Sequence, residues 1–157
     1  HPDSQAFSAA LGDLSLKFES LDCVNGMNDV DRTTFINRGK ALIEFQDKEI
    51  AAIAKSAVLA EFEGHTVYAV NCLRYRSDVG NYLAKKPECK FAVMYNYSLE
   101  KNEWWISLRG IKEHGLNLSE IAHGFGGGGH PLASGFTYQG GLGDILKVIN
   151  STKFSDE

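Results

Sequence analysis

The chain has 157 residues and a formal net charge of −4, and both numbers limit what it can be. The length suits one domain, or one domain with an arm, and allows a hydrophobic core without disulfides or metal. The composition, 43% hydrophobic and 23% charged, is ordinary for a globular protein. A general nucleic-acid coat protein is normally basic, so any phosphate binding here must come from a local site.

The sequence also indicates where the protein resides. No apolar run approaches the ~18 residues of a membrane span, and the polar first residues predict no signal peptide. We therefore expect a cytoplasmic protein without a membrane partner. The three cysteines, Cys23, Cys72 and Cys89, form no Cys-x-x-Cys pair, so their spacing predicts reduced thiols and no zinc site. Because the first residue is not Met, we expect a piece cut from a longer protein, with tag removal or processing as the alternatives.

The first third of the chain has helical patterns. Good capping residues precede a helix over residues 5–11 and open a second short helix over 13–21. A longer apolar stripe runs over 31–57, and Gly39 within it costs ~1 kcal/mol relative to Ala, which predicts a break there. Because this stretch carries no chemical signature, we expect residues 1–57 to be a helical arm or linker.

Strands and helices alternate in the remaining residues, which we expect to form one domain over 58–157. The expected strands are 58–62, 66–72, 90–97 and 104–109, and the expected helices are 77–85, 117–123 and 142–150. A hairpin turn is expected at Glu63, Gly64 and His65. This alternation predicts an α/β fold, a mixed β-sheet flanked by helices, with the helical arm at the N-terminus.

Four consecutive glycines, Gly126, Gly127, Gly128 and Gly129, precede His130. Such a run is entropically costly in a folded domain, and successive N–H groups without Cβ atoms can hold an anion. The alternative is a flexible loop. The same segment satisfies G-x-G-x-x-G, but the residues before it indicate a helix where a dinucleotide fold needs a strand. We expect His130 to contact a ligand phosphate or transfer a proton; the alternative is a half-buried His bonded to backbone.

Two further groups of cations follow expected strands. Arg109 ends the strand that contains Ser107, and its planar fork suits a phosphate; an ordinary surface Arg is the alternative. Arg74 and Arg76 lie near an expected helix start and suggest a second anion patch, although surface charge is the favoured interpretation.

Several of these motifs together resemble the DHH-associated C-terminal domain of the DHH phosphoesterases, a family with oligoribonuclease-like and exopolyphosphatase-related members. The resemblance covers roughly residues 60–150. Its motifs are Ser107-Leu108-Arg109, Glu120-Ile121-Ala122, Gly126-Gly127-Gly128-Gly129-His130-Pro131 and Ala133-Ser134-Gly135-Phe136.

The resemblance implies a two-lobed enzyme, in which an N-terminal lobe binds manganese or magnesium through Asp and Asp-His-His motifs. The C-terminal lobe then holds the substrate's phosphate or nucleotide. By this similarity the glycine run from Gly126 to Gly129, with Arg109 and His130, would grip phosphate, and Ser107 would position the ligand. Ser134, also a candidate binding residue, stands where the family commonly has Ala.

The sequence departs from the family in having no Asp-His-His. We therefore expect no cofactor in this chain, manganese or magnesium in the missing N-terminal lobe, and no hydrolysis by this chain alone. The expected partners are a nucleotide or short oligonucleotide and the N-terminal DHH lobe of the parent protein; a homodimer is left open.

Three other functions stay open at this point. One is a non-catalytic nucleotide-sensing module, and another is a lobe specific for polyphosphate or cyclic dinucleotides. The third is the related terminal domain of alanyl-transfer-RNA synthetases, against which the acidic balance of the chain argues. Low basicity favours short ligands, because long nucleic acid needs many phosphate contacts. If Trp104, Trp105 or Tyr138 line the site, base stacking is expected.

Overall fold

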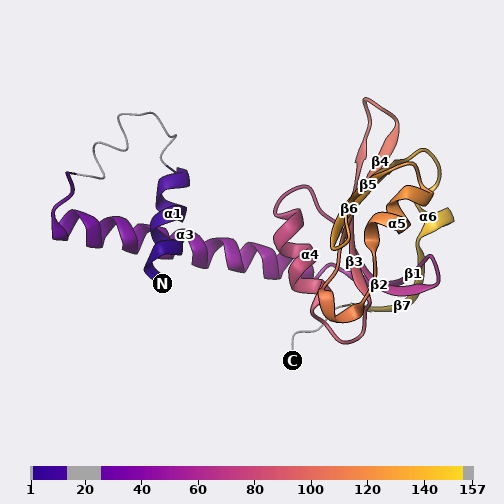
Figure 1. Ribbon diagram of the computed structural model, residues 1–157, viewed down its shortest axis with the longest axis horizontal. Helices are drawn as coiled ribbons and strands as arrows, with labels where there is room; N and C mark the ends of the chain where they lie inside the picture. The colour runs from indigo at the N-terminus through magenta and orange to yellow at the C-terminus, as the bar shows by residue number, and fades with distance from the viewer. Residues whose placement is uncertain (1, 14–25, 154–157) are drawn as a thin grey trace. The chain divides into compact units, whose positions relative to one another are not determined.

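The computed structural model describes residues 2–13 and 26–153 (Figure 1). The chain divides into two compact units, His1–Glu49 and Ile50–Glu157, and each is described by itself below. The short helix expected over 13–21 and Cys23 lie outside the described residues. None of the helices in the described ranges is both long enough and apolar enough to cross a membrane.

The first unit contains α1 (Pro2–Asp13) and most of α3 (Asp29–Ala54), whose last residues belong to the second unit. The break expected at Gly39 is wrong, because α3 continues through it as one helix (Figure 1). A Cβ at Gly39 would lie 1.7 Å from the Ala6 carbonyl oxygen. The glycine therefore lets the backbone of α1 approach α3, and the edge-on contact of Phe7 with Phe35, 5.1 Å between ring centroids, packs beside it.

The second unit is built around a mixed seven-stranded sheet in the order β5-β6-β4-β3-β2-β1-β7. The strands are β1 (Val58–Phe62), β2 (His65–Asn71), β3 (Phe91–Ser98), β4 (Glu103–Arg109), β5 (Gly128–His130), β6 (Ala133–Tyr138) and β7 (Lys147–Lys153). The helices are α4 (Arg76–Ala84), the 3₁₀ turn η1 (Lys112–His114), α5 (Leu118–Gly124) and α6 (Leu142–Ile145). Because β2 pairs with β3 in parallel and the other neighbours are antiparallel, the expected mixed α/β sheet is confirmed.

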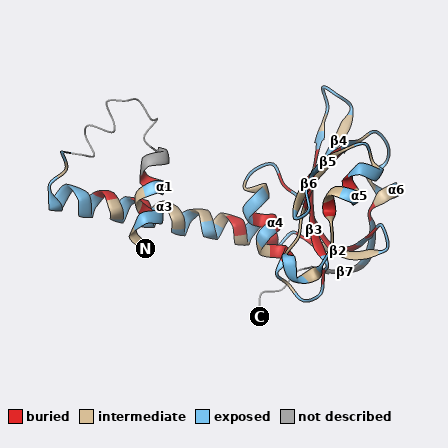
Figure 2. Ribbon diagram, in the orientation of Figure 1, coloured by how far each residue is buried: buried red, intermediate tan, exposed pale blue. Residues whose placement is uncertain are grey.

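Apolar side chains cover both faces of this sheet. One cluster joins Val79 and Leu83 of α4 to Ala92 and Met94 of β3. The other joins Leu118 and Ala122 of α5 to strand residues of the opposite face. Accordingly α4 and α5 lie on opposite sides of the sheet, and their inner residues are buried (Figures 1 and 2). We call the two sides the α4 face and the α5 face.

Several elements of the second unit differ from the sequence predictions, which included neither β5 nor β6. The helix expected over 142–150 is wrong beyond Ile145, because Lys147–Lys153 forms β7 and pairs antiparallel with β1. Val148 and Ile149 are β-branched residues that favour a strand once an edge is open to them. The helix after β2 begins at Arg76, one residue before the expected Ser77, and Tyr75 at its N-cap has φ 55° without a side-chain cap.

The two cysteines within the described residues are free and buried. Burial raises the pKa of the Cys89 thiol to about 11 and also raises the pKa of the Cys72 thiol. Both groups are therefore neutral, unreactive thiols near neutral pH.

Candidate functional site

The alternation of side chains along β4 determines which residues of this strand belong to the candidate site. Ile106 and Leu108 are buried in the cluster of the α5 face. Ser107 and Arg109 pair in register with Met94 and Ala92, which belong to the cluster under α4. Since paired residues of an antiparallel ladder share a face, Ser107 and Arg109 lie on the α4 face. Trp105, two residues before Ser107, lies on it too.

Arg109 is a half-buried cation held by neutral groups. Its Nη2 donates to the Ser77 hydroxyl at 3.0 Å, and its Nη1 donates to the Leu108 carbonyl at 2.9 Å. A Cβ at Gly80 would lie 2.6 Å from the Arg109 Cγ, so this glycine of α4 makes room for the arginine stem. Burial lowers the pKa of the guanidinium. A partly desolvated charge with neutral partners attracts an anion.

Arg76 is a second cation on the α4 face. Its Nε donates to the Cys72 carbonyl at 3.2 Å, and its Nη2 donates to the Asn96 side-chain oxygen. Its Cζ lies 6.0 Å from the centroid of the Trp105 ring. Arg76 is therefore a partly exposed cation with fixed hydrogen-bond partners. The available signal was Asn96, an amide within an apolar strand, which needs a partner when buried.

The glycine run is shaped mainly by its neighbour β6. A Cβ at Gly127 would lie 2.2 Å from the Gly135 carbonyl oxygen, and one at Gly129 would lie 2.7 Å from the Ala133 oxygen. The N–H of Gly126 donates to the His123 carbonyl at 3.0 Å, and that of Gly127 to the Ala122 carbonyl at 2.9 Å. Because these two N–H groups are already bonded, we leave them out of the site.

The end of the run forms β5, which is an edge strand of the sheet. Gly128, Gly129 and His130 therefore have a neighbouring strand, β6, on one side of their backbone. His130 pairs with Ala133, which in turn pairs with Arg109, so the three residues follow one line across β5, β6 and β4. The edge backbone and the exposed His130 are thus in register with the arginine.

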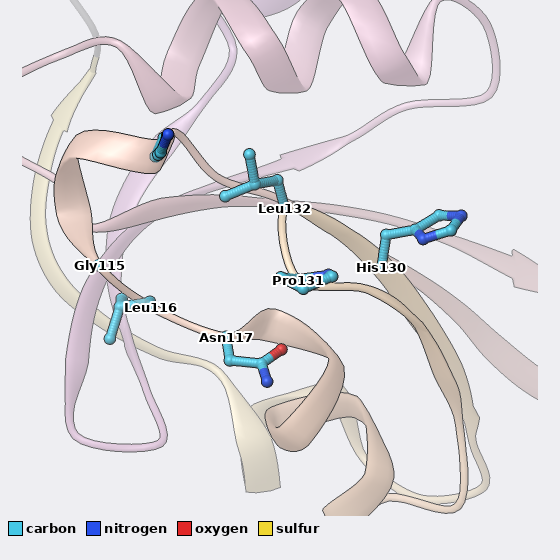
Figure 3. Close-up of a pocket in the computed structure, with 7 residues that line it drawn as sticks. Gly115, Leu116, Asn117, His130, Pro131 and Leu132 are labelled. Atoms are coloured by element: carbon cyan, nitrogen blue, oxygen red, sulfur yellow. The ribbon is translucent and has the colours of Figure 1, made fainter.

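A surface pocket of ≈ 560 Å³ lies where β5 turns into β6. Leu116, Pro131 and Leu132 give it apolar walls, and its polar groups come from Lys112, Asn117 and His130. The His130 ring projects away from the other lining side chains (Figure 3). An apolar hollow with a few polar groups is typical of a small-molecule site.

Backbone hydrogen bonds hold the two walls of this pocket together. The Gly110 N–H donates to the Leu132 carbonyl at 3.0 Å, and the Leu118 N–H donates to the Pro131 carbonyl at 2.8 Å. Asn117 caps α5 by accepting from the Ser119 N–H at 3.2 Å, as its position before the helix predicts. The pocket is therefore joined directly to the end of β4, next to Arg109.

Ser134 lies away from these groups. It is buried, and its hydroxyl donates to the Leu118 carbonyl at 2.7 Å. This bond ties β6 to the first turn of α5 on the α5 face. We therefore give Ser134 a structural role and leave it out of the site.

Of the three aromatic residues considered for base stacking, only Trp105 lies on the α4 face. Trp104 and Tyr138 pack against the cluster of the α5 face. The Trp104 indole N–H donates to the Gly140 carbonyl at 3.2 Å, and its ring meets that of Tyr95 edge-on at 5.9 Å.

The described residues do not fit a metal. Within residues 2–13 and 26–153, no three or more His, Cys, Asp or Glu side chains converge in a way that could hold an ion. The polar groups of the α4 face are cations, hydroxyls and an imidazole, which are suited to binding an anion.

The known proteins that are similar to this chain include one viral sequence relative and two solved structures. No family model matches the chain. It is 34% identical over 110 residues to the uncharacterized protein R106 of Acanthamoeba polyphaga mimivirus; the match covers 67% of this chain and 26% of that protein. This chain thus spans about a quarter of the length of its curated relative.

Two of the similar structures have TM-scores below 0.5. An uncharacterized protein from Helicobacter pylori G27 has a TM-score of 0.42 and 18% identity, over 74% of this chain and 30% of that one. The pGpG-specific phosphodiesterase PggH from Vibrio cholerae has a TM-score of 0.46 and 11% identity, over 73% of this chain and 46% of that one.

Proposed function

We propose that this chain binds the phosphate of a small nucleotide or short oligonucleotide on the α4 face, as the substrate-binding lobe of a metal-dependent phosphoesterase. The observation that carries the proposal is Arg109, a half-buried cation whose hydrogen-bond partners within the described ranges are a hydroxyl and a carbonyl. A phosphate would give this charge the counterion that those partners do not supply.

The donors around Arg109 suit a phosphate group. A guanidinium has five N–H donors, and the two bonds to Ser77 and Leu108 use two of them. The Ser77 hydroxyl accepts from Arg109 and can still donate its own proton. His130 is in register with Arg109 across β6 and presents an imidazole on the same face, two strands away. Charge-assisted bonds of this kind are about twice as strong as neutral ones.

The proposed role of the chain is binding and orientation. Under this proposal manganese or magnesium would belong to a separate N-terminal lobe, as the resemblance to the DHH family implies, and no step uses a metal held by the described residues. In such an enzyme, a lobe that fixes the phosphate contributes by positioning the reacting bond against the metals.

Isothermal titration calorimetry of the 157-residue chain tests the proposal. The panel contains mononucleotides, linear dinucleotides, cyclic dinucleotides, short oligonucleotides and inorganic polyphosphate. We expect one nucleotide class to bind, and we expect Arg109→Ala to weaken its affinity about tenfold to hundredfold, since a hydrogen bond to a charged group contributes about 1.5–3 kcal/mol. Arg109→Lys should recover only part of the lost affinity, because a lysine lacks the planar guanidinium that donates two hydrogen bonds to one phosphate.

Arg32→Ala is the matched control, since it removes the same charge from an exposed position of α3. Thermal unfolding of each variant verifies that the sheet is intact. Nucleotide binding that is equally strong in the Arg109→Ala and Arg32→Ala variants would contradict the proposed site, and the absence of any binding would contradict the proposed function.

A further inference from the structure

Trp105 lies between two cations on the same face as Arg109. Its ring centroid is 6.0 Å from the Arg76 Cζ and 5.4 Å from the Lys101 Nζ. Its indole N–H donates to the Glu103 carboxylate at 2.9 Å. The side chain is 37% exposed, which is unusual for a residue whose ring can bury so much apolar surface.

The two cations are held very differently. Arg76 is fixed by its bonds to the Cys72 carbonyl and the Asn96 amide, so it is a permanent neighbour of the ring. Lys101 belongs to the exposed turn between β3 and β4, and its ammonium sits on a flexible four-carbon stem. An exposed cation–π contact contributes only about 0.5–1 kcal/mol, so a planar ring of a ligand can displace the Lys101 ammonium from the Trp105 ring.

The position of Trp105 along β4 relates it to the phosphate site. Trp105, Ser107 and Arg109 are successive residues of one face, and a strand rises about 3.3 Å per residue. Trp105 and Arg109 are therefore about 13 Å apart along the strand. A ligand that reaches both must be longer than one nucleotide, and it needs a flat group at one end and a phosphate at the other.

We propose that Trp105 is a stacking platform for a nucleobase of a single-stranded oligonucleotide whose phosphate lies at Arg109. The base takes the place of the Lys101 ammonium on the ring, and Lys101 then pairs with a neighbouring phosphate. Arg76 stays beside the ring and adds positive charge. This inference rests on the proposed function and narrows its ligand to an oligonucleotide, because polyphosphate has no base to stack.

Tryptophan fluorescence gives a direct test, since the chain has two tryptophans. In a Trp104→Phe chain, Trp105 is the remaining one. We titrate this chain with a short single-stranded oligoadenylate, with an abasic strand of the same length, and with inorganic polyphosphate. The inference requires the oligoadenylate to quench Trp105 emission and the abasic strand and polyphosphate to leave it nearly unchanged.

Affinities measured by calorimetry give the second readout. Replacing an aromatic side chain that stacks on one base by alanine lowers the binding affinity about five- to hundredfold. Trp105→Ala should therefore weaken the binding of oligoadenylate by that factor and leave the binding of the abasic strand nearly unchanged. Trp105→Phe should retain most of the affinity. Tyr97→Ala is the matched control, because it removes a 41% exposed aromatic ring from the same hairpin on the opposite face.

The two proposals fail in different ways. If oligoadenylate binding depends on Arg109 but Trp105 emission and the Trp105→Ala affinity do not change, the stacking inference is overturned and the phosphate site stands. If no ligand binds the unsubstituted chain, the proposed function is overturned and the stacking inference with it.

Discussion

The two faces of β4 show how one strand serves two purposes. On the α5 face, Ile106 and Leu108 are buried and Trp104 packs on Tyr95. On the α4 face, Ser107 and Arg109 remain partly exposed and Trp105 lies against cations. Adjacent tryptophans thus have unlike surroundings, because neighbouring residues of a strand point to opposite faces.

The difference follows from which strands each helix covers. α4 packs against β3 and β4, whereas α5 packs against β4, β5 and β6. Polar side chains of β4 on the α4 face therefore lie at the border of a helix, where Ser77 and Arg76 of α4 can reach them. The candidate site therefore lies where the part of the sheet that α4 covers meets the part that it leaves uncovered.

The largest expected effect concerns the buried face. Leu108→Ala should lower the free energy of unfolding by about 2–5 kcal/mol, because the fully buried side chain leaves a cavity. Ser107→Ala, on the adjacent residue, should change it by less than about 0.5 kcal/mol. Urea unfolding of both variants measures the contrast, and equal losses would remove the distinction between the faces.

The glycine run offers a second contrast. Gly127→Ala places a methyl group against the Gly135 backbone oxygen and should lower the free energy of unfolding by about 1–3 kcal/mol without any ligand. At Gly128 the nearest atom to an added Cβ is 3.6 Å away in the His123 ring, so Gly128→Ala should cost less than about 0.5 kcal/mol. Thermal melts of the two variants test this, and a stable Gly127→Ala chain would show that β6 does not constrain the run.

On the α4 face, one substitution should weaken ligand binding and leave the stability of the fold unchanged. Ser77→Ala removes the hydroxyl that accepts from Arg109 and should weaken phosphate binding about tenfold or more, since a hydrogen bond to a charged group contributes about 1.5–3 kcal/mol. The exposed position predicts a melting temperature close to that of the unsubstituted chain. Calorimetry and melting curves together measure both quantities; a lower melting temperature with intact binding would reverse the assignment.

Near neutral pH the smallest effect comes from Cys89, whose contribution to stability changes only under alkaline conditions. Its pKa is raised to about 11 from a value of 9.0, so the unfolded chain loses this thiol proton at lower pH than the folded one. Stability is therefore unaffected by this group below pH 9 and falls as the pH rises from about 9 towards 11. Urea midpoints across that range should decline less steeply in Cys89→Ala, and identical slopes in the two chains would exclude the effect.

Local patterns in the sequence were enough for much of the fold. The strand over 58–62 and the hairpin turn at Glu63 and Gly64 match the structure, because both depend on neighbouring residues. The strand β7 was missed, because Lys147–Lys153 pairs with β1, far away in the sequence. Likewise, Gly39 is explained by a helix that crosses it, and no pattern within α3 contains that information.

The candidate site also contains some residues that local sequence identifies and others that only the folded structure brings together. Arg109 at a strand end and His130 after the glycines were recognisable, because residue type and local position carried the signal. The pairing of Arg76 with Asn96 was not recognisable, since these residues lie twenty positions apart and meet only when α4 packs across β3. The sequence identified single side chains, whereas their grouping on one face depended on the register of four strands, β3, β4, β5 and β6.

The close approach of the glycine run to β6 has an evolutionary consequence. Homologues with or without the proposed phosphate site should retain Gly127 and Gly129, since a Cβ at either position would clash with the backbone of β6. Purifying selection at these two positions therefore reports on folding. Under the proposed function, substitutions at Arg109, His130 and Trp105 would distinguish homologues that have lost the ligand from those that still bind it.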